Sequence, residues 1–205
     1  MISASQFIVL AKSPYRESAL LLNGISPDYG RLSLVLHGAL KSSDGKMPAA
    51  DLYRELEVEF KEEENSTLYT ATAAEVIAAF DAIADHTREF MMAGRISSFL
   101  LKNLAPGVPQ PYTYDAFRSI LGRLAAGEVE GNWTLEQCAV VLKTAFLYEN
   151  GLLPEGTSGR QRDFLENLVA AGIDDSELPE CAAGYWTKLN GWLNALLDYH
   201  QLARS

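Results

Sequence analysis

Apolar residues between positions 7 and 46 fall into three short runs separated by turn residues. The three runs are Phe7–Lys12, Ala19–Asn23 and Arg31–His37. In the third run leucine occupies every second position, which is the period of a strand with one buried face. The gaps Ser13–Ser18 and Gly24–Gly30 each contain proline, and Gly30 can adopt a positive φ. We therefore predict three antiparallel strands followed by a polar loop, Gly38–Lys46.

Two further strands are predicted at Leu52–Lys61 and Thr67–Thr72. In Leu52–Lys61 the apolar side chains of Leu56, Val58 and Phe60 point to one face of the strand. The residues expected on its exposed face are Glu55, Glu57, Glu59 and Lys61. Five strands within about seventy residues indicate a small closed barrel of the OB type, because closure removes the exposed edges of a meander.

Helical periodicity dominates after the strands. The predicted helices are Ala73–Ala84, Arg88–Leu104, Tyr114–Ala126, Leu135–Glu149, Arg160–Ala171 and Tyr185–Ala203. Thr134 and Gln137 form a capping box that starts the fourth helix, and the prolines of Ala105–Pro111 exclude helix there. The expected fold class is α+β, with a five-stranded barrel over residues 1–72 and an all-α domain over 73–205.

Composition is that of a globular protein, with 48% apolar and 21% charged residues. No apolar run approaches the roughly 20 residues that span a membrane. The amino terminus lacks a basic segment before its apolar run, which favours a strand over a signal peptide. Cys138 and Cys181 lie far apart and suggest no disulfide framework. A cytoplasmic protein is expected.

The net charge of −10 argues against broad affinity for nucleic acids, which bind clustered Lys and Arg. The charge is unevenly distributed along the chain. Residues 1–50 contain five Lys and Arg against three Asp and Glu, whereas residues 51–205 contain twelve against twenty-four. The acidity therefore belongs to the later part of the chain.

No residue pattern typical of enzyme catalysis is present. His37, His86 and His200 lack the spacing of metal ligands, and the two cysteines cannot make a four-ligand zinc site by themselves. The glycines fit neither phosphate-binding pattern, and the glutamates of Leu52–Lys61 are interpreted as a solvated face. We expect no enzymatic activity, no cofactor and no metal.

The predicted DNA-binding residues combine cations with one aromatic ring on the predicted barrel. They are Lys12, Tyr15, Arg16, Arg31, Lys41 and Lys46. A small barrel binds single-stranded DNA with Lys and Arg side chains along a groove and with an aromatic ring on which nucleobases stack. A second interpretation stays open, in which Arg16 pairs locally with Glu17 and Tyr15 packs the turn.

Several segments resemble the RecO family of bacterial recombination mediators. The matching segments are Tyr15–Ser18, Gly30–Leu32, Gly38, Ala39 and Lys41, the stretch Phe146–Pro154 (FLYENGLLP), and the end Leu196–Ser205. The resemblance covers most of the chain, and it rests on the order and spacing of these segments rather than on one of them.

The resemblance implies a role in DNA repair and recombination. A RecO-like protein binds single- and double-stranded DNA, anneals complementary strands and assists recombinase loading onto strands covered by single-strand-binding protein. The implied partners are RecR, at the barrel, and the carboxy-terminal tail of single-strand-binding protein, at the helices. The implied location is the cytoplasm, in association with the nucleoid.

The chain departs from the family pattern in two places. The segment in which some relatives carry a cysteine-rich zinc module, Glu155–Gly184, contains only Cys181, so the module is expected to be absent. The loop Gly38–Lys46 is less basic than its counterparts, because Leu40 and Asp44 interrupt it. The alternative function is a protein-interaction adaptor of the same fold with little direct affinity for DNA.

Overall fold

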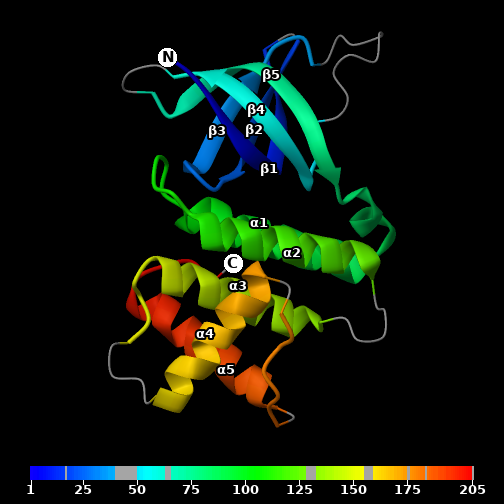
Figure 1. The fold of residues 1–205 in the computed structure, drawn as a ribbon. Coiled ribbons are helices and arrows are strands. Elements are labelled where there is room, and N and C mark those ends of the chain that lie inside the picture. Colours follow the sequence, from blue (N-terminus) through cyan, green and yellow to red (C-terminus); the bar gives the residue numbers. More distant parts are fainter. Residues whose placement is uncertain are drawn as a thin grey trace. The chain divides into compact units, whose positions relative to one another are not determined.

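The computed structural model describes residues 1–16, 18–39, 50–62, 66–127, 133–154, 159–174, 176–182 and 184–204. The chain forms two compact units. The barrel unit comprises Met1–Asp81 and Leu104–Pro109, and the helical unit comprises Ala82–Asn103 and Gln110–Ser205. The predicted fold class, a five-stranded barrel followed by helices, is confirmed (Figure 1).

The barrel closes in the order β1-β2-β3-β5-β4 (Figure 1). Its strands are β1 (Ile2–Tyr15), β2 (Ala19–Ser26), β3 (Gly30–Leu36), β4 (Arg54–Lys61) and β5 (Leu68–Ala79). All neighbouring pairs are antiparallel except β3 and β5, which pair in parallel over three residues from Ser33 to Val35. This five-stranded closure is the OB arrangement.

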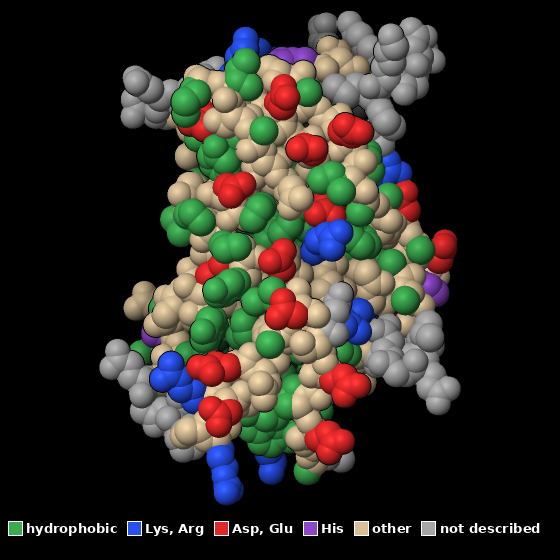
Figure 2. Space-filling model, in the orientation of Figure 1, with side chains coloured by type: hydrophobic (Ala, Val, Ile, Leu, Met, Phe, Trp, Pro, Cys, Tyr) green, Lys and Arg blue, Asp and Glu red, His purple; other side chains and the backbone are tan. Residues whose placement is uncertain are grey.

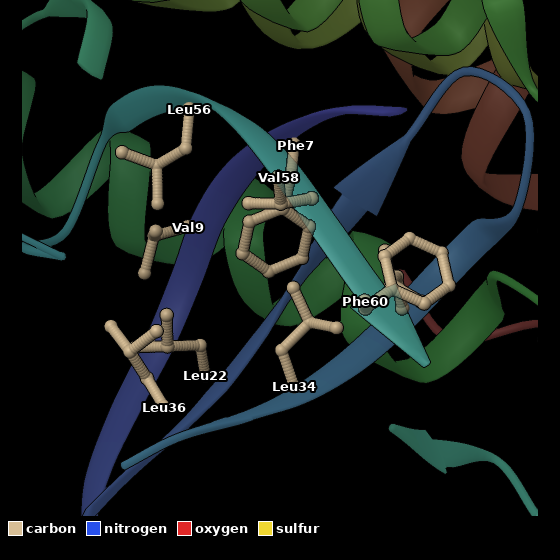
Figure 3. Packing of buried hydrophobic residues seen from close by; sticks show 9 residues of the cluster. Phe7, Val9, Leu22, Leu34, Leu36, Leu56, Val58 and Phe60 are labelled. Carbon is tan, nitrogen blue, oxygen red and sulfur yellow. The ribbon is translucent and has the colours of Figure 1, made fainter. Parts of the chain in front are cut away.

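Alternating side chains of the strands fill the barrel interior. The buried cluster is Phe7, Val9, Leu22, Leu32, Leu34, Leu36, Leu56, Val58 and Phe60 (Figure 3). The predicted inward faces of β3 and β4 are therefore confirmed. Phe60 is fully buried, and its ring meets Tyr29 edge-on at 5.2 Å and stacks on Tyr69 at 5.4 Å between centroids.

The predicted helix Ala73–Ala84 is wrong, because β5 continues through this alanine-rich segment to Ala79. Alanine favours helix locally, but here pairing along the whole of β4 outweighs that preference. Helical backbone begins only at Asp81–Asp85, which is a short 3₁₀ helix. The predicted domain boundary after residue 72 therefore lies inside β5.

The segment Leu104–Pro109 leaves the helices and returns to the barrel unit. Pro106 bridges to Gly30, the Gly107 N–H donates to the Tyr29 carbonyl at 2.8 Å, and the Arg31 N–H donates to the Ala105 carbonyl at 3.2 Å. The sequence predicts only a non-helical connector here. We call this segment the strap.

The described residues of the helical unit form five α-helices. They are α1 (Thr87–Asn103), α2 (Pro111–Ala126), α3 (Leu135–Glu149), α4 (Gly159–Ile173) and α5 (Tyr185–Tyr199). The capping box is confirmed, since the Gln137 N–H donates to Thr134 Oγ1 at 3.2 Å and the Thr134 N–H donates to Gln137 Oε1 at 2.7 Å. The last helix ends earlier than predicted, and Gln201 follows it with a φ of 59°.

The FLYENGLLP segment ends α3 and also anchors the start of α2. The Glu149 carboxylate accepts hydrogen bonds from the N–H groups of Tyr112 and Thr113, at 2.9 and 3.0 Å. A carboxylate at this position stabilises the positive end of the helix dipole. Asn150 and Gln110 exchange two side-chain hydrogen bonds of 3.1 Å. The segment that resembles the family signature is thus a helix-to-helix clamp.

Candidate nucleic-acid interface

The far end of the β1–β2 hairpin carries three of the predicted binding residues, Lys12, Tyr15 and Arg16. Residues 11–15 of β1 pair with β2 alone, because the pairing of β1 with β4 covers only Ile2–Ile8. The predicted turn at Ser13–Ser18 is therefore shorter, since Tyr15 still pairs with Ala19. Pro14 fits this stretch because a strand with one free side needs fewer N–H donors.

Tyr15 and Arg16 stand next to each other at this turn. The Arg16 guanidinium lies 5.2 Å from the centroid of the Tyr15 ring, which is the range of a cation–π contact. Arg16 is exposed, Tyr15 is half-buried, and Arg16 has a φ of 54°. A left-handed conformation costs a residue other than glycine about 1 kcal/mol. The turn therefore presents a cation and a ring on a strained backbone.

Lys12 is exposed on the same hairpin and forms an ion pair with Asp51 at 2.6 Å. The hydrogen bond from Lys12 is the main cause that holds the pKa of Asp51 below its usual value. An exposed pair of this kind contributes little to stability, so a competing anion can replace Asp51 as the partner of Lys12. In the structure as it stands, however, the charge of Lys12 is balanced.

Arg31 does not join this group. It pairs with Ile25 of β2, whereas Tyr15 pairs with Ala19. Those two partners are six positions apart, or roughly 20 Å along β2. Arg31 is half-buried, and its backbone is bound by the strap.

Lys41 and Lys46 lie outside the described residues. The residues that flank their loop lie near the hairpin end of the barrel. Leu36, near the start of the loop, pairs with Leu20, the neighbour of Ala19. Asp51, just after the loop, is the residue that contacts Lys12.

Exposed acidic side chains lie on β4 and β5. Glu57 of β4 pairs directly with Glu75 of β5, and both side chains are exposed, as is that of Glu59. The predicted solvated face of β4 is correct for Glu57 and Glu59 but wrong for Glu55, which is buried at a shift in the β4–β5 register. Figure 2 shows acidic side chains spread over the face in view.

The full extent of β4 and β5 changes the charge of the barrel. The barrel unit contains seven Lys and Arg against twelve Asp and Glu, a net charge of −5. The positive balance of residues 1–50 is thus reversed once the remaining strands are included. Any attraction for an anion is therefore local to the hairpin end.

The helical unit contains a cavity that the sequence does not reveal, of about 220 Å³. It is lined by Met92, Arg95, Ile96, Phe99, Ala139, Leu142, Lys143, Asn190, Asn194 and Arg204. We call it the cationic cavity. Its three cations come from α1, α3 and the segment after α5, so no short motif could have predicted their meeting.

Lys143 is the most buried cation of the cationic cavity. Its Nζ donates to Asn190 Oδ1 at 2.9 Å and to Asn194 Oδ1 at 2.7 Å, so its partners are neutral amides. Burial is the main cause that lowers the pKa of Lys143, and the charge of Arg204 lowers it further. Arg204 is itself oriented by Asp198, whose Oδ1 accepts from Arg204 Nε at 2.7 Å.

Within the described ranges, no three His, Cys, Asp or Glu side chains are grouped as metal ligands. The Cys138 thiol is buried, and burial raises its pKa to about 12, which disfavours the reactive thiolate. No helix in this part of the chain has the length and apolar character needed to cross a membrane.

Residues 1–80 match the family described as the amino-terminal domain of recombination protein O. The chain is 32% identical to the DNA repair protein RecO of Stenotrophomonas maltophilia over 146 residues, which cover 71% of this chain and 59% of that protein. It is 28% identical to the DNA repair protein RecO of Geobacter metallireducens over 124 residues, which cover 60% and 50%. The chain thus spans about half the length of these relatives. Residues 1–80, which contain the OB barrel, therefore match the amino-terminal domain of the RecO family, and the chain as a whole is similar to these two RecO proteins.

Proposed function

We propose that this chain acts in DNA repair and recombination as a mediator that binds DNA and proteins without covalent chemistry. It binds single- and double-stranded DNA, anneals complementary strands and assists recombinase loading onto strands covered by single-strand-binding protein. The main support is the hairpin end, where Tyr15 and Arg16 are in contact and Lys12 lies three residues before Tyr15 on the same strand, on a barrel of the RecO amino-terminal family.

In this proposal the hairpin end supplies both interactions that a single strand needs. The Tyr15 ring stacks on a base, and the exposed guanidinium of Arg16 binds a phosphate. Lys12 exchanges Asp51 for a second phosphate. The backbone of Arg16 supports a role for its side chain, since glycine would occupy the same left-handed conformation without strain.

The remaining predicted residues extend this proposed surface. Lys41 and Lys46 belong to it on the grounds of their sequence position between Leu36 and Asp51. Arg31 lies on β3, opposite the other end of β2. A strand that contacts both Arg31 and Arg16 therefore runs along the length of the barrel.

The first test is fluorescence anisotropy of a labelled single strand, titrated with protein at several salt concentrations. We expect salt-dependent binding that weakens about tenfold in the Arg16→Glu and Lys41→Glu variants, and a salt slope reduced by about one for each lost phosphate contact. Lys61→Glu is the matched control. Lys61 pairs with Ile2 at the opposite end of β1 from Tyr15, so its reversal should change the affinity by less than about twofold.

The net charge of the barrel unit favours a second candidate function, the protein-interaction adaptor. In that case DNA contact is supplied by partners, and the pairing of Lys12 with Asp51 is permanent. Absence of binding even at low salt would favour the adaptor and rule out direct contact with DNA.

We further propose RecR as a partner of the barrel and the acidic tail of single-strand-binding protein as a partner of the cationic cavity. The apolar walls of the cavity suit an apolar residue, and Arg95, Lys143 and Arg204 suit a carboxylate. Lys143 has no carboxylate partner within the described residues. An incoming carboxylate would therefore find a half-buried cation that is hydrogen-bonded to neutral amides.

Calorimetry with a tail peptide that contains both acidic and apolar residues tests the cationic cavity. We expect Lys143→Met to weaken binding about tenfold, because it removes a charge-assisted hydrogen bond. Lys102→Met, at the last turn of α1 and outside the cavity lining, is the control.

The pH dependence gives an independent readout of the same site. In the free protein the pKa of Lys143 is lowered, and a bound carboxylate raises it, so binding takes up a proton at high pH. The affinity for the peptide should therefore be highest below the lowered pKa that Lys143 has in the free protein, and it should fall as the pH rises through that pKa. Lys143→Met should lose this fall. An unchanged pH profile in the variant would contradict the assignment.

A further inference from the structure

A second groove in the helical unit lies between α4 and α5 and has a volume of about 470 Å³. It is lined by Pro154, Gln161, Phe164, Leu165, Tyr185, Lys188, Leu189 and Trp192. We call it the aromatic groove. It shares no residue with the cationic cavity, so the two are separate features of the same unit.

Three aromatic side chains line this groove, namely Phe164, Tyr185 and Trp192. Phe164 of α4 meets Tyr185 of α5 edge-on, with 5.3 Å between the ring centroids. Tyr185 remains 38% exposed and Trp192 36% exposed. Aromatic rings order on binding at a small entropic cost, and exposed apolar surface of this kind marks interaction sites.

The charge of the aromatic groove favours an anionic occupant. Lys188 lies three residues after Tyr185 and four before Trp192, which places all three on one face of α5. Its amine makes no hydrogen bond or ion pair within the described part of the chain, and the lining contains no carboxylate. The cationic cavity differs, since it combines three cations with mainly aliphatic walls. Flat rings beside one cation fit a nucleobase and its phosphate better than a carboxylate tail.

We infer that the aromatic groove stacks the bases of single-stranded nucleic acid, with Lys188 binding a phosphate. This inference rests on the proposed function, because it adds a second contact for the same ligand. The helical unit contains ten Lys and Arg against fifteen Asp and Glu, so long-range attraction does not favour the approach of a strand. Affinity at this groove therefore comes mainly from stacking, which depends little on salt.

The test is anisotropy of a labelled oligothymidylate across a salt series, with Trp192→Leu as the main variant. We expect affinity to fall about tenfold at every salt concentration with the salt slope unchanged, because the lost ring carries no charge. Arg16→Glu should instead reduce the slope. Tyr199→Leu is the control, since Tyr199 is 80% exposed on the same helix and lies outside the groove.

A duplex and a crosslinking experiment complete the test. Binding of a double strand should be the same for Trp192→Leu and the unmodified protein, because paired bases are not free to stack on a side chain. Photo-crosslinking of the unmodified protein with an iodouracil-substituted oligonucleotide should modify Trp192 or Tyr185. This measurement does not depend on the folding of any variant.

The outcomes distinguish failure of the inference from failure of the proposed function. Binding by the unmodified protein with no loss in Trp192→Leu and no crosslink at α5 would overturn the groove and leave the proposed function standing. No binding by the unmodified protein would overturn both. A proline-rich peptide that occupies the groove in the absence of any crosslink to DNA would overturn the inference as well.

Discussion

A Gly24→Ala variant is expected to lose about 3 kcal/mol of unfolding free energy. A Cβ at position 24 would lie 2.1 Å from the carbonyl oxygen of Ile8 and 2.5 Å from the ring of Phe7. Gly24 pairs with Val9 at the point where the β1–β2 register shifts, and both Ile8 and Phe7 are fully buried. Neither the backbone nor the ring can move aside without disturbing the barrel core.

Gly191→Ala is the matched control, because it makes the same chemical change in open space. Nothing lies within 4 Å of a Cβ at position 191 inside α5, so alanine should stabilise the helix by about 1 kcal/mol. All three tryptophans belong to the helical unit, so their fluorescence reports its unfolding in denaturant. Hydrogen exchange of β1 and β2 amides reports the barrel. Equal protection of these amides in Gly24→Ala and the unmodified protein would show that the barrel tolerates the extra carbon.

A Phe60→Ala variant should destabilise the barrel by about 4 kcal/mol. The change removes a fully buried ring of the core cluster (Figure 3). It also removes the aromatic contacts with Tyr29 and Tyr69 and would leave a cavity in the core. Ile77→Ala, at a 45% exposed position of β5, should cost less than about 1 kcal/mol. The same exchange measurement compares the two variants, and a similar loss in both would contradict the assignment of Phe60 to the core.

Periodicity predicted the strand faces because every second residue of these strands is buried, so apolar residues recur at every second position of the sequence. Leu32, Leu34 and Leu36 line the interior as expected, and Thr134 caps α3 through a contact that spans three residues. The helix predicted over Ala73–Ala84 was wrong because its structure depends on a distant part of the chain. Its alanines favour helix, and only the distant partner β4 makes most of it a strand.

In the candidate site, too, the local contacts were predictable and the contacts between distant segments were not. The turn after β1 could be located from local residues, so Tyr15 and Arg16 were found together. The separation of Arg31 depends on how far β2 runs before β3 begins, which is set by pairing across the barrel. The cationic cavity gathers residues from helices far apart in the chain, and the aromatic groove depends on how α4 packs against α5, so no spacing rule covers either of them.

The strap has a consequence for how the protein emerges from the ribosome. The carbonyl of Tyr29 and the N–H of Arg31 receive their partners from Gly107 and Ala105, about seventy-five residues later in the chain. The five strands can pair with one another as soon as β5 has been translated, because their closure does not involve the strap. The hydrogen bonds between Leu104–Pro109 and the residues Tyr29 and Arg31 form only after the whole of α1 has been translated.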